Sequence, residues 1–143
     1  TRAVASSRGQ REVPLWDYWT GYKKTVKADD ELIVGIRVQR RPCDVEWFHK
    51  VGARSAQAIT KVGVAMVHSA SGWRVTANSV APFVCRCRAM EAALDRGEEF
   101  RSPDDVRRII SKDVAPIDDL RSTAAYRMTV LSRLVYCRML AHL

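Results

Sequence analysis

The spacing of apolar residues changes once along this chain, and that change limits the folds available to it. Up to about residue 81, apolar side chains alternate with polar ones in short runs, which is the period of a β-strand. After Cys85 they recur every three to four residues, as in an amphipathic helix. Strands followed by helices are typical of an α+β domain. We expect an antiparallel sheet of three to four strands, with about three helices, mostly C-terminal, packed on one face.

Four runs of apolar and polar alternation predict strands, at residues 31–39, 44–50, 62–68 and 73–81. The first of them (ELIVGIRVQ) is expected to have one apolar side, made by Leu32, Val34, Ile36 and Val38. A turn at 69–72 would join the third run to the fourth as a hairpin. Residues 53–60 are rich in alanine and could form either a loop or a short helical turn.

The C-terminal part of the chain predicts three helices. The first covers 88–96 and ends at Gly97. The second begins with Ser102 as its N-cap and Pro103 in its first turn, followed by two aspartates. The third covers 123–142, and its inner seam is expected to consist of Ala125, Met128, Ser132, Val135 and Met139, widened by Leu131 and Leu134.

A chain of 143 residues is long enough for one ordinary domain. Residues 1–12 are small and polar and are expected to form a flexible lead-in segment, so the domain would cover 13–143. Residues 13–22 (VPLWDYWTGY) hold two of the four Trp and two of the four Tyr, which predicts that they pack against something. No apolar stretch is long enough to span a membrane and no secretory segment is visible, so we expect a cytoplasmic protein.

The formal net charge of +8 raises the hypothesis of nucleic-acid binding. The basic residues are scattered, however, and occur in tight pairs only at 23–24, 40–41 and 107–108. No run of Lys and Arg carries interleaved aromatic residues. We therefore expect a basic surface that faces solvent or another subunit, and no nucleic-acid partner.

The residue patterns of a self-contained active site are missing. There is no nucleophile elbow and no phosphate-binding loop, and His49, His68 and His142 lie far apart in the sequence. The four cysteines, at 43, 85, 87 and 137, lack the spacing of a zinc site. Cys85 and Cys87 would point to the same side of a strand and could bind a soft metal, but unpaired, buried cysteines in a reducing cytoplasm are the favoured interpretation. We expect no catalytic and no metal-binding residues.

Several segments resemble a known family. They are 31–38 (ELIVGIRV), 48–62 (FHKVGARSAQAITKV), 81–83 (APF), 90–94 (MEAAL) and 115–127 (APIDDLRSTAAYR). Their order and spacing resemble the C-terminal domain of the FAD-binding, or medium, subunit of molybdenum hydroxylases, the xanthine dehydrogenase and carbon monoxide dehydrogenase group. In this family the subunit takes electrons from a molybdopterin centre through iron–sulfur clusters and passes them through FAD to an acceptor.

The resemblance implies a set of partners and a shared cofactor. The partners are the preceding FAD-binding domain, the molybdopterin-binding large subunit and the iron–sulfur small subunit. Family members hold the FAD pyrophosphate with two glycine-rich loops in the preceding domain, and neither loop occurs here. The chain is thus expected to begin inside the usual subunit, to share FAD with that domain, and to retain little of it alone.

The resemblance also implies the residues that face the flavin. Lys50 would lie near the isoalloxazine ring and Ile59 would pack close to it, with Arg54 and Gln57 on the loop between them. Tyr22 is a further candidate for a ring contact. Relatives often carry an acidic residue where this chain has Gln57 and the alanine after it, which leaves the electron acceptor open.

Two functions from different classes follow. In the first, the chain is part of an FAD-dependent oxidoreductase complex, flanks the isoalloxazine, supports electron transfer and assembly, and does not catalyse alone. In the alternative, it is a stand-alone basic α+β interaction module without a cofactor.

Overall fold

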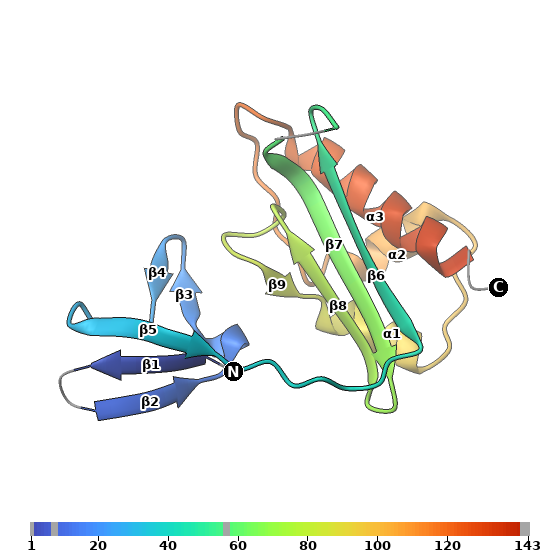
Figure 1. The fold of residues 1–143 in the computed structure, drawn as a ribbon. Coiled ribbons are helices and arrows are strands. Elements are labelled where there is room, and N and C mark those ends of the chain that lie inside the picture. The colour runs from blue at the N-terminus through green and yellow to red at the C-terminus, as the bar shows by residue number, and fades with distance from the viewer. Residues whose placement is uncertain (1, 7–8, 56–57, 141–143) are drawn as a thin grey trace. The chain divides into compact units, whose positions relative to one another are not determined.

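The computed structural model describes residues 2–6, 9–55 and 58–140, and it divides into two compact units, Thr1–Arg41 and Pro42–Leu143 (Figure 1). The boundary expected after residue 12 does not coincide with this division. Two strands also lie in the stretch that was expected to be a flexible lead-in. Each unit is described by itself below.

The N-terminal unit is built from short antiparallel strands. Its larger sheet has the order β2-β1-β5 and contains β1 (Arg2–Ser6), β2 (Gly9–Val13) and β5 (Glu31–Ile36). A 3₁₀ turn (Leu15–Asp17) leads into a two-stranded sheet of β3 (Trp19–Gly21) and β4 (Lys24–Thr25). Val13 and Tyr18 form the buried centre, with Trp19 and Val26 half-buried against them. The prediction that residues 13–22 pack against something therefore holds for Tyr18 and in part for Trp19, whereas Trp16 and Tyr22 are exposed.

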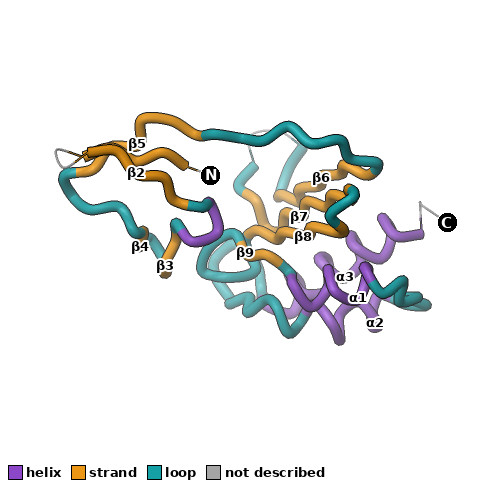
Figure 2. The backbone as a smooth tube through the Cα atoms, turned by 90° about the horizontal axis from the view of Figure 1, so that it is seen from below, coloured by secondary structure: helices purple, strands orange, loops and turns teal. Residues whose placement is uncertain are grey.

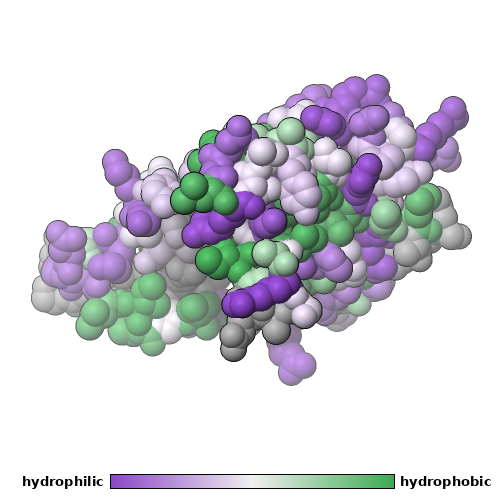
Figure 3. Space-filling model, turned by 90° about the horizontal axis from the view of Figure 1, so that it is seen from above, coloured by the Kyte–Doolittle hydropathy of each residue, from purple (hydrophilic) through white to green (hydrophobic). Residues whose placement is uncertain are grey.

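Strand β5 differs from its prediction in two ways. It pairs with β1, in the order β2-β1-β5, rather than joining the sheet of the other three predicted strands. The apolar side predicted for this strand is exposed at Leu32, Val34 and Ile36, and Figure 3 shows apolar residues gathered on the surface of this unit, at the left of the view. The buried residue is Glu31, which accepts from Arg11 Nε at 2.7 Å.

The C-terminal unit contains one four-stranded antiparallel sheet in the order β6-β7-β8-β9. Its strands are β6 (Val45–Gly52), β7 (Thr60–Ser69), β8 (Gly72–Asn78) and the short β9 (Cys85–Arg86). Helices α1 (Arg88–Asp95), α2 (Pro103–Ile110) and α3 (Ala124–Leu140) all lie on one side of this sheet (Figure 2). The α+β fold class and the helical face are thereby confirmed.

The core of this unit lies between the sheet and the helices. Alternate residues of the two central strands point toward the helices and are fully buried: Val62, Val64, Met66, Val75 and Ala77. They pack against Met90, Ile110 and Leu131 from the three helices. The opposite face of the sheet carries no helix among the described residues, so its side chains are free to contact another surface.

Local signals explain where the helices begin. Ser102 Oγ accepts from Asp105 N at 3.3 Å, and Asp105 Oδ2 accepts from Ser102 N at 3.0 Å, so the predicted cap of α2 is a full capping box. The seam of α3 is rotated from its prediction. Met128, Leu131, Ser132 and Val135 are buried as expected, but Ala125 is exposed and Arg127 is buried.

The four cysteines are free thiols, as expected, although only Cys87 is fully buried. In the described part of the chain, no helix is long and apolar enough to cross a membrane.

Candidate functional site

The loop between β6 and β7 carries most of the residues expected at a flavin. It is a series of bends, which decides the open choice between a loop and a helical turn for its described residues. Its two arms approach closely at Gly52, where a Cβ atom would lie 2.6 Å from that of Ala58. Lys50 closes the loop from the strand side, because its Nζ donates to the carbonyl of Ala58 at 3.2 Å. The position of the Lys50 ammonium is therefore tied to the end of this loop.

Two large apolar side chains are exposed near this lysine. Phe48 is 69% exposed, and it lies on the same face of β6 as Lys50 because the two are two positions apart in the strand. Ile59 follows Ala58 in the loop and is 64% exposed. The end of the edge strand thus presents a cation together with apolar surface. Phe48 was part of the recognised motif but was not named as a site residue, and its alternation with Lys50 is the signal that could have found it.

The remaining predicted site residues are placed less directly. Arg54 lies in the bend after β6 and is exposed. Gln57 lies outside the described residues. Tyr22 belongs to the N-terminal unit, in the turn between β3 and β4, where the Lys23 ammonium lies 5.4 Å from its ring centroid. A site that combines Tyr22 with Lys50 therefore stays a prediction.

A buried arginine fixes the helical layer at the same end of the sheet. Arg127 Nη1 donates to the carbonyls of Lys61, at 3.2 Å, and Ser79, at 2.6 Å, and Nη2 lies 2.6 Å from Asp119 Oδ1. The backbone N–H of Arg121 and the Arg127 guanidinium together lower the pKa of Asp119. This network joins the start of α3 to both β7 and the end of β8. It therefore supports the strand that follows the β6–β7 loop.

Other reactive side chains do not form a catalytic constellation. His68 Nδ1 lies 2.7 Å from Asp44 Oδ2 and lowers the pKa of that carboxyl, which ties the start of β6 to the end of β7. The Cys85 thiol and burial raise the pKa of Cys87, so the buried thiol is a poor nucleophile. Within the described ranges, no group of three His, Cys, Asp or Glu residues could hold a metal ion.

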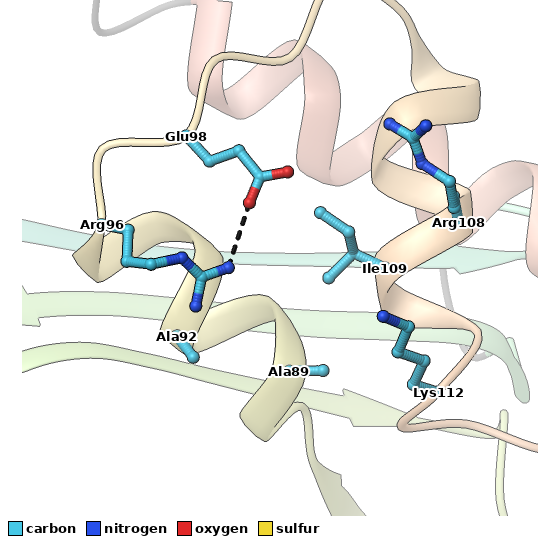
Figure 4. Close-up of a pocket in the computed structure, with 7 residues that line it drawn as sticks. All are labelled: Ala89, Ala92, Arg96, Glu98, Arg108, Ile109 and Lys112. Atoms are coloured by element: carbon cyan, nitrogen blue, oxygen red, sulfur yellow. Dashed lines mark hydrogen bonds and ion pairs between the residues drawn. The ribbon is translucent and has the colours of Figure 1, made fainter.

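A shallow hollow of about 520 Å³ lies between α1 and α2 (Figure 4). Ile109 points into it, Arg96 pairs with Glu98 on one side, and Arg108 and Lys112 line the other. Its lining comes from the helical layer and includes none of the predicted flavin-facing residues.

Residues 47–141 match the family described as the CO dehydrogenase flavoprotein C-terminal domain. The chain belongs to this family. The match begins at Trp47 and includes the whole β6–β7 loop, the Arg127 network and all three helices. The resemblance drawn from the sequence motifs is therefore confirmed.

Solved structures agree with this assignment. Carbon monoxide dehydrogenase from Hydrogenophaga pseudoflava, in a form that lacks the Mo-pyranopterin moiety of the molybdenum cofactor, is 26% identical with a TM-score of 0.78. The match covers 94% of this chain and 49% of that one. Reconstituted CO dehydrogenase from Oligotropha carboxidovorans (20% identity, TM-score 0.77, 94% and 49% coverage) and quinoline 2-oxidoreductase from Pseudomonas putida 86 (16%, 0.77, 96% and 50%) share the fold.

The chain therefore spans about half the length of the solved chains that it resembles. The comparison with curated proteins gave no match.

Proposed function

We propose that this chain is the C-terminal portion of a molybdenum hydroxylase flavoprotein subunit, and that the end of β6 and the β6–β7 loop flank the isoalloxazine ring of FAD. The rest of the cofactor would be held by the half of the subunit that the solved relatives contain beyond the matched region, which we call the companion half. In this role the chain supports electron transfer from iron–sulfur clusters through FAD to an acceptor, as part of an oxidoreductase complex. It does not catalyse alone.

The observation that carries this proposal is the anchored Lys50 beside exposed apolar side chains. A planar ring system needs apolar contacts on its face, which Phe48 and Ile59 can provide because both are exposed. The contact of Lys50 with Ala58 and the close approach at Gly52 hold these groups on a tied loop rather than on a mobile tail. The surface therefore fits one edge of a flavin.

The chain's own chemical contribution is electrostatic. Bound FAD supplies the redox chemistry, and the protein adjusts how easily the ring is reduced. An ammonium group near the ring stabilises the negative charge that develops on reduction. Ile59 and Phe48 exclude water from that region, which strengthens the interaction because water screens charges.

The same proposal includes three partners: the companion half, a molybdopterin-binding large subunit and an iron–sulfur small subunit. The exposed face of the β6–β9 sheet and the basic residues of the helical layer leave surface for such contacts. A cytoplasmic location and the absence of a nucleic-acid partner remain part of the proposal.

The test is the reduction potential of the flavin in the complex of this chain with its companion half. Replacing Lys50 by Met removes the cation at similar length, and we expect the midpoint potential to fall by about 20–40 mV, which for two electrons corresponds to about 1–2 kcal/mol. Lys50→Arg should restore most of the potential. If the midpoint potential and the absorbance of the flavin are unchanged in Lys50→Met, the proposed placement is refuted.

Lys112→Met is the matched control. Lys112 is an exposed lysine of the helical layer, beyond the end of α2, so the same change of charge there should leave the potential unaltered. If the chain instead purifies as a stable assembly that contains no flavin under any condition, the stand-alone interaction module is the better description.

A further inference from the structure

Among the residues whose burial the structure describes, the buried hydrophobic centre of the N-terminal unit consists of Val13 and Tyr18. Units of about 40 residues generally need additional support to stay folded. Meanwhile the side chains of β5 are largely exposed: Leu32 by 75%, Val34 by 56% and Ile36 by 62%. Apolar side chains gathered in this way mark an interaction surface.

The backbone of β5 is also available for pairing. In the order β2-β1-β5 it lies at an edge of the sheet, and on its outer side no described strand pairs with it. Edge strands are usually protected by lysine, proline or very short length, since their free N–H and C=O groups can pair with another chain. β5 has six residues, ELIVGI, with neither lysine nor proline.

The other edges in the chain have a different composition. β2, at the opposite edge of the same sheet, contains Gln10, Arg11 and Glu12. β6, at the edge of the other sheet, contains Glu46, His49 and Lys50. The remaining edge strands, β3, β4 and β9, have three residues or fewer and are protected by their short length. Among the described strands the lack of protection is therefore specific to β5, which points to a strand that is covered in the assembled protein.

The extent of the similarity identifies what covers it. The match to the C-terminal domain family begins at Trp47, after the whole N-terminal unit. The similarity to the Hydrogenophaga structure covers 94% of this chain, so it extends well into residues 1–41, yet it includes only 49% of that chain. The N-terminal unit lies outside the matched C-terminal domain, and the solved relatives contain another half beyond the matched region. That half is therefore the expected partner that covers β5.

We propose that β5 docks on the companion half of the flavoprotein subunit, pairing through the outer backbone edge of residues 32–36 with a strand of that half while Leu32, Val34 and Ile36 become buried. The N-terminal unit then completes a sheet of the companion half rather than forming part of the C-terminal domain. Strand addition of this kind combines backbone hydrogen bonds with burial of alternate side chains. The inference shares the companion half with the proposed function but does not depend on where the flavin lies.

The experiment supplies the companion half from the same genome as a separate tagged polypeptide, co-expressed with this chain. We expect a 1:1 complex by affinity purification and sedimentation. The double substitution Val34→Lys with Ile36→Lys should weaken copurification at least tenfold, because it places charge on the docking edge. The matched control, Ile117→Lys with Leu120→Lys, changes two exposed apolar residues of the C-terminal unit and should bind like the unchanged chain.

Helical circular dichroism shows that the C-terminal unit of each variant is folded, and the near-ultraviolet signal of the packed Tyr18–Trp19 pair shows whether the N-terminal unit is folded. Failure of the two polypeptides to copurify, or equal binding by the β5 variant, would overturn the proposal. A homodimer of this chain would also overturn the proposal if it persists when the companion half is present and is abolished by the β5 substitutions. In that case a second copy of the chain would cover β5. If the complex forms through β5 but the midpoint potential of its flavin is unchanged in Lys50→Met, only the proposed placement of the flavin is refuted.

Discussion

The guanidinium of Arg127 is almost completely buried between α3 and the sheet, where it donates to the carbonyls of Lys61 and Ser79. Replacing it by Met would leave both carbonyls and Asp119 without their partner, at a cost of about 3 kcal/mol in the free energy of unfolding. Urea denaturation measures this loss. Arg133→Met, on the exposed side of the same helix, should change the free energy of unfolding by less than about 0.5 kcal/mol.

The carboxylate of Asp119 makes the same network sensitive to acid. Its folded pKa is lowered, first by the N–H of Arg121 and then by Arg127, so its contribution is complete above the unfolded pKa of about 3.9 and is lost as the pH falls through the folded value. We expect the free energy of unfolding to fall less steeply below about pH 4 in Asp119→Asn than in the unchanged chain. Part of the pH dependence of the free energy of unfolding should remain in Asp119→Asn, because the pKa values of Asp44 and Asp105 are also lowered. Identical pH profiles for the two proteins would contradict this assignment.

At the scale of the elements, the β7–β8 hairpin depends on a glycine that faces α1. Gly72 has a φ of +86°, and a Cβ atom there would lie 2.7 Å from Asp95 Oδ1, which accepts from Trp73 N. Gly72→Ala should therefore lower the free energy of unfolding by more than about 1 kcal/mol. Gly97→Ala separates the causes, because Gly97 also has a positive φ but no atom within 4 Å of the added methyl group. A similar loss in both variants, measured by thermal unfolding, would mean that backbone strain alone is responsible.

The same hairpin shows what periodicity can predict. The runs at 62–68 and 73–81 and the turn at 69–72 correspond to β7, β8 and their connection, since one face of each strand is buried and leaves a clear alternation. The helices were likewise located to within a few residues from caps and spacing. For the candidate site, the family motif predicted Lys50 and Ile59, whose roles at a flavin stay predictions, and the structure adds the hydrogen bond from Lys50 to the carbonyl of Ala58, the residue before Ile59.

Other elements could not be predicted because their causes are not local. Strands β1 and β2 lack an apolar alternation, and they exist through pairing with each other and with β5, far along the sequence. β9 has only two residues, too few for any period to appear. The burial of Arg127 was missed for a related reason: hydropathy places an arginine outside, and only the carbonyls that meet at the end of the sheet make its burial favourable.

At the scale of the whole molecule, the helix N-termini bear on how FAD could bind. Such termini ordinarily bind phosphate groups through free backbone N–H groups. Here carboxylates already accept from them: Asp113 from Ala89 N and Met90 N in α1, Asp105 from Ser102 N in the capping box of α2, and Asp118 from Ala124 N in α3. Each terminus would therefore repel a diphosphate rather than hold one.

The isolated chain should accordingly retain little or no FAD. The seven glycines are spread singly along the sequence, so no glycine-rich loop can wrap a diphosphate, and the surface around Lys50 that we propose to face the flavin offers contacts to one edge of the ring only. After incubation with FAD and gel filtration, the protein fraction should show no stoichiometric flavin absorbance, whereas the complex with the companion half should show it. Tight one-to-one binding by this chain alone would mean that it contains a phosphate site, and the shared-cofactor arrangement would have to be abandoned.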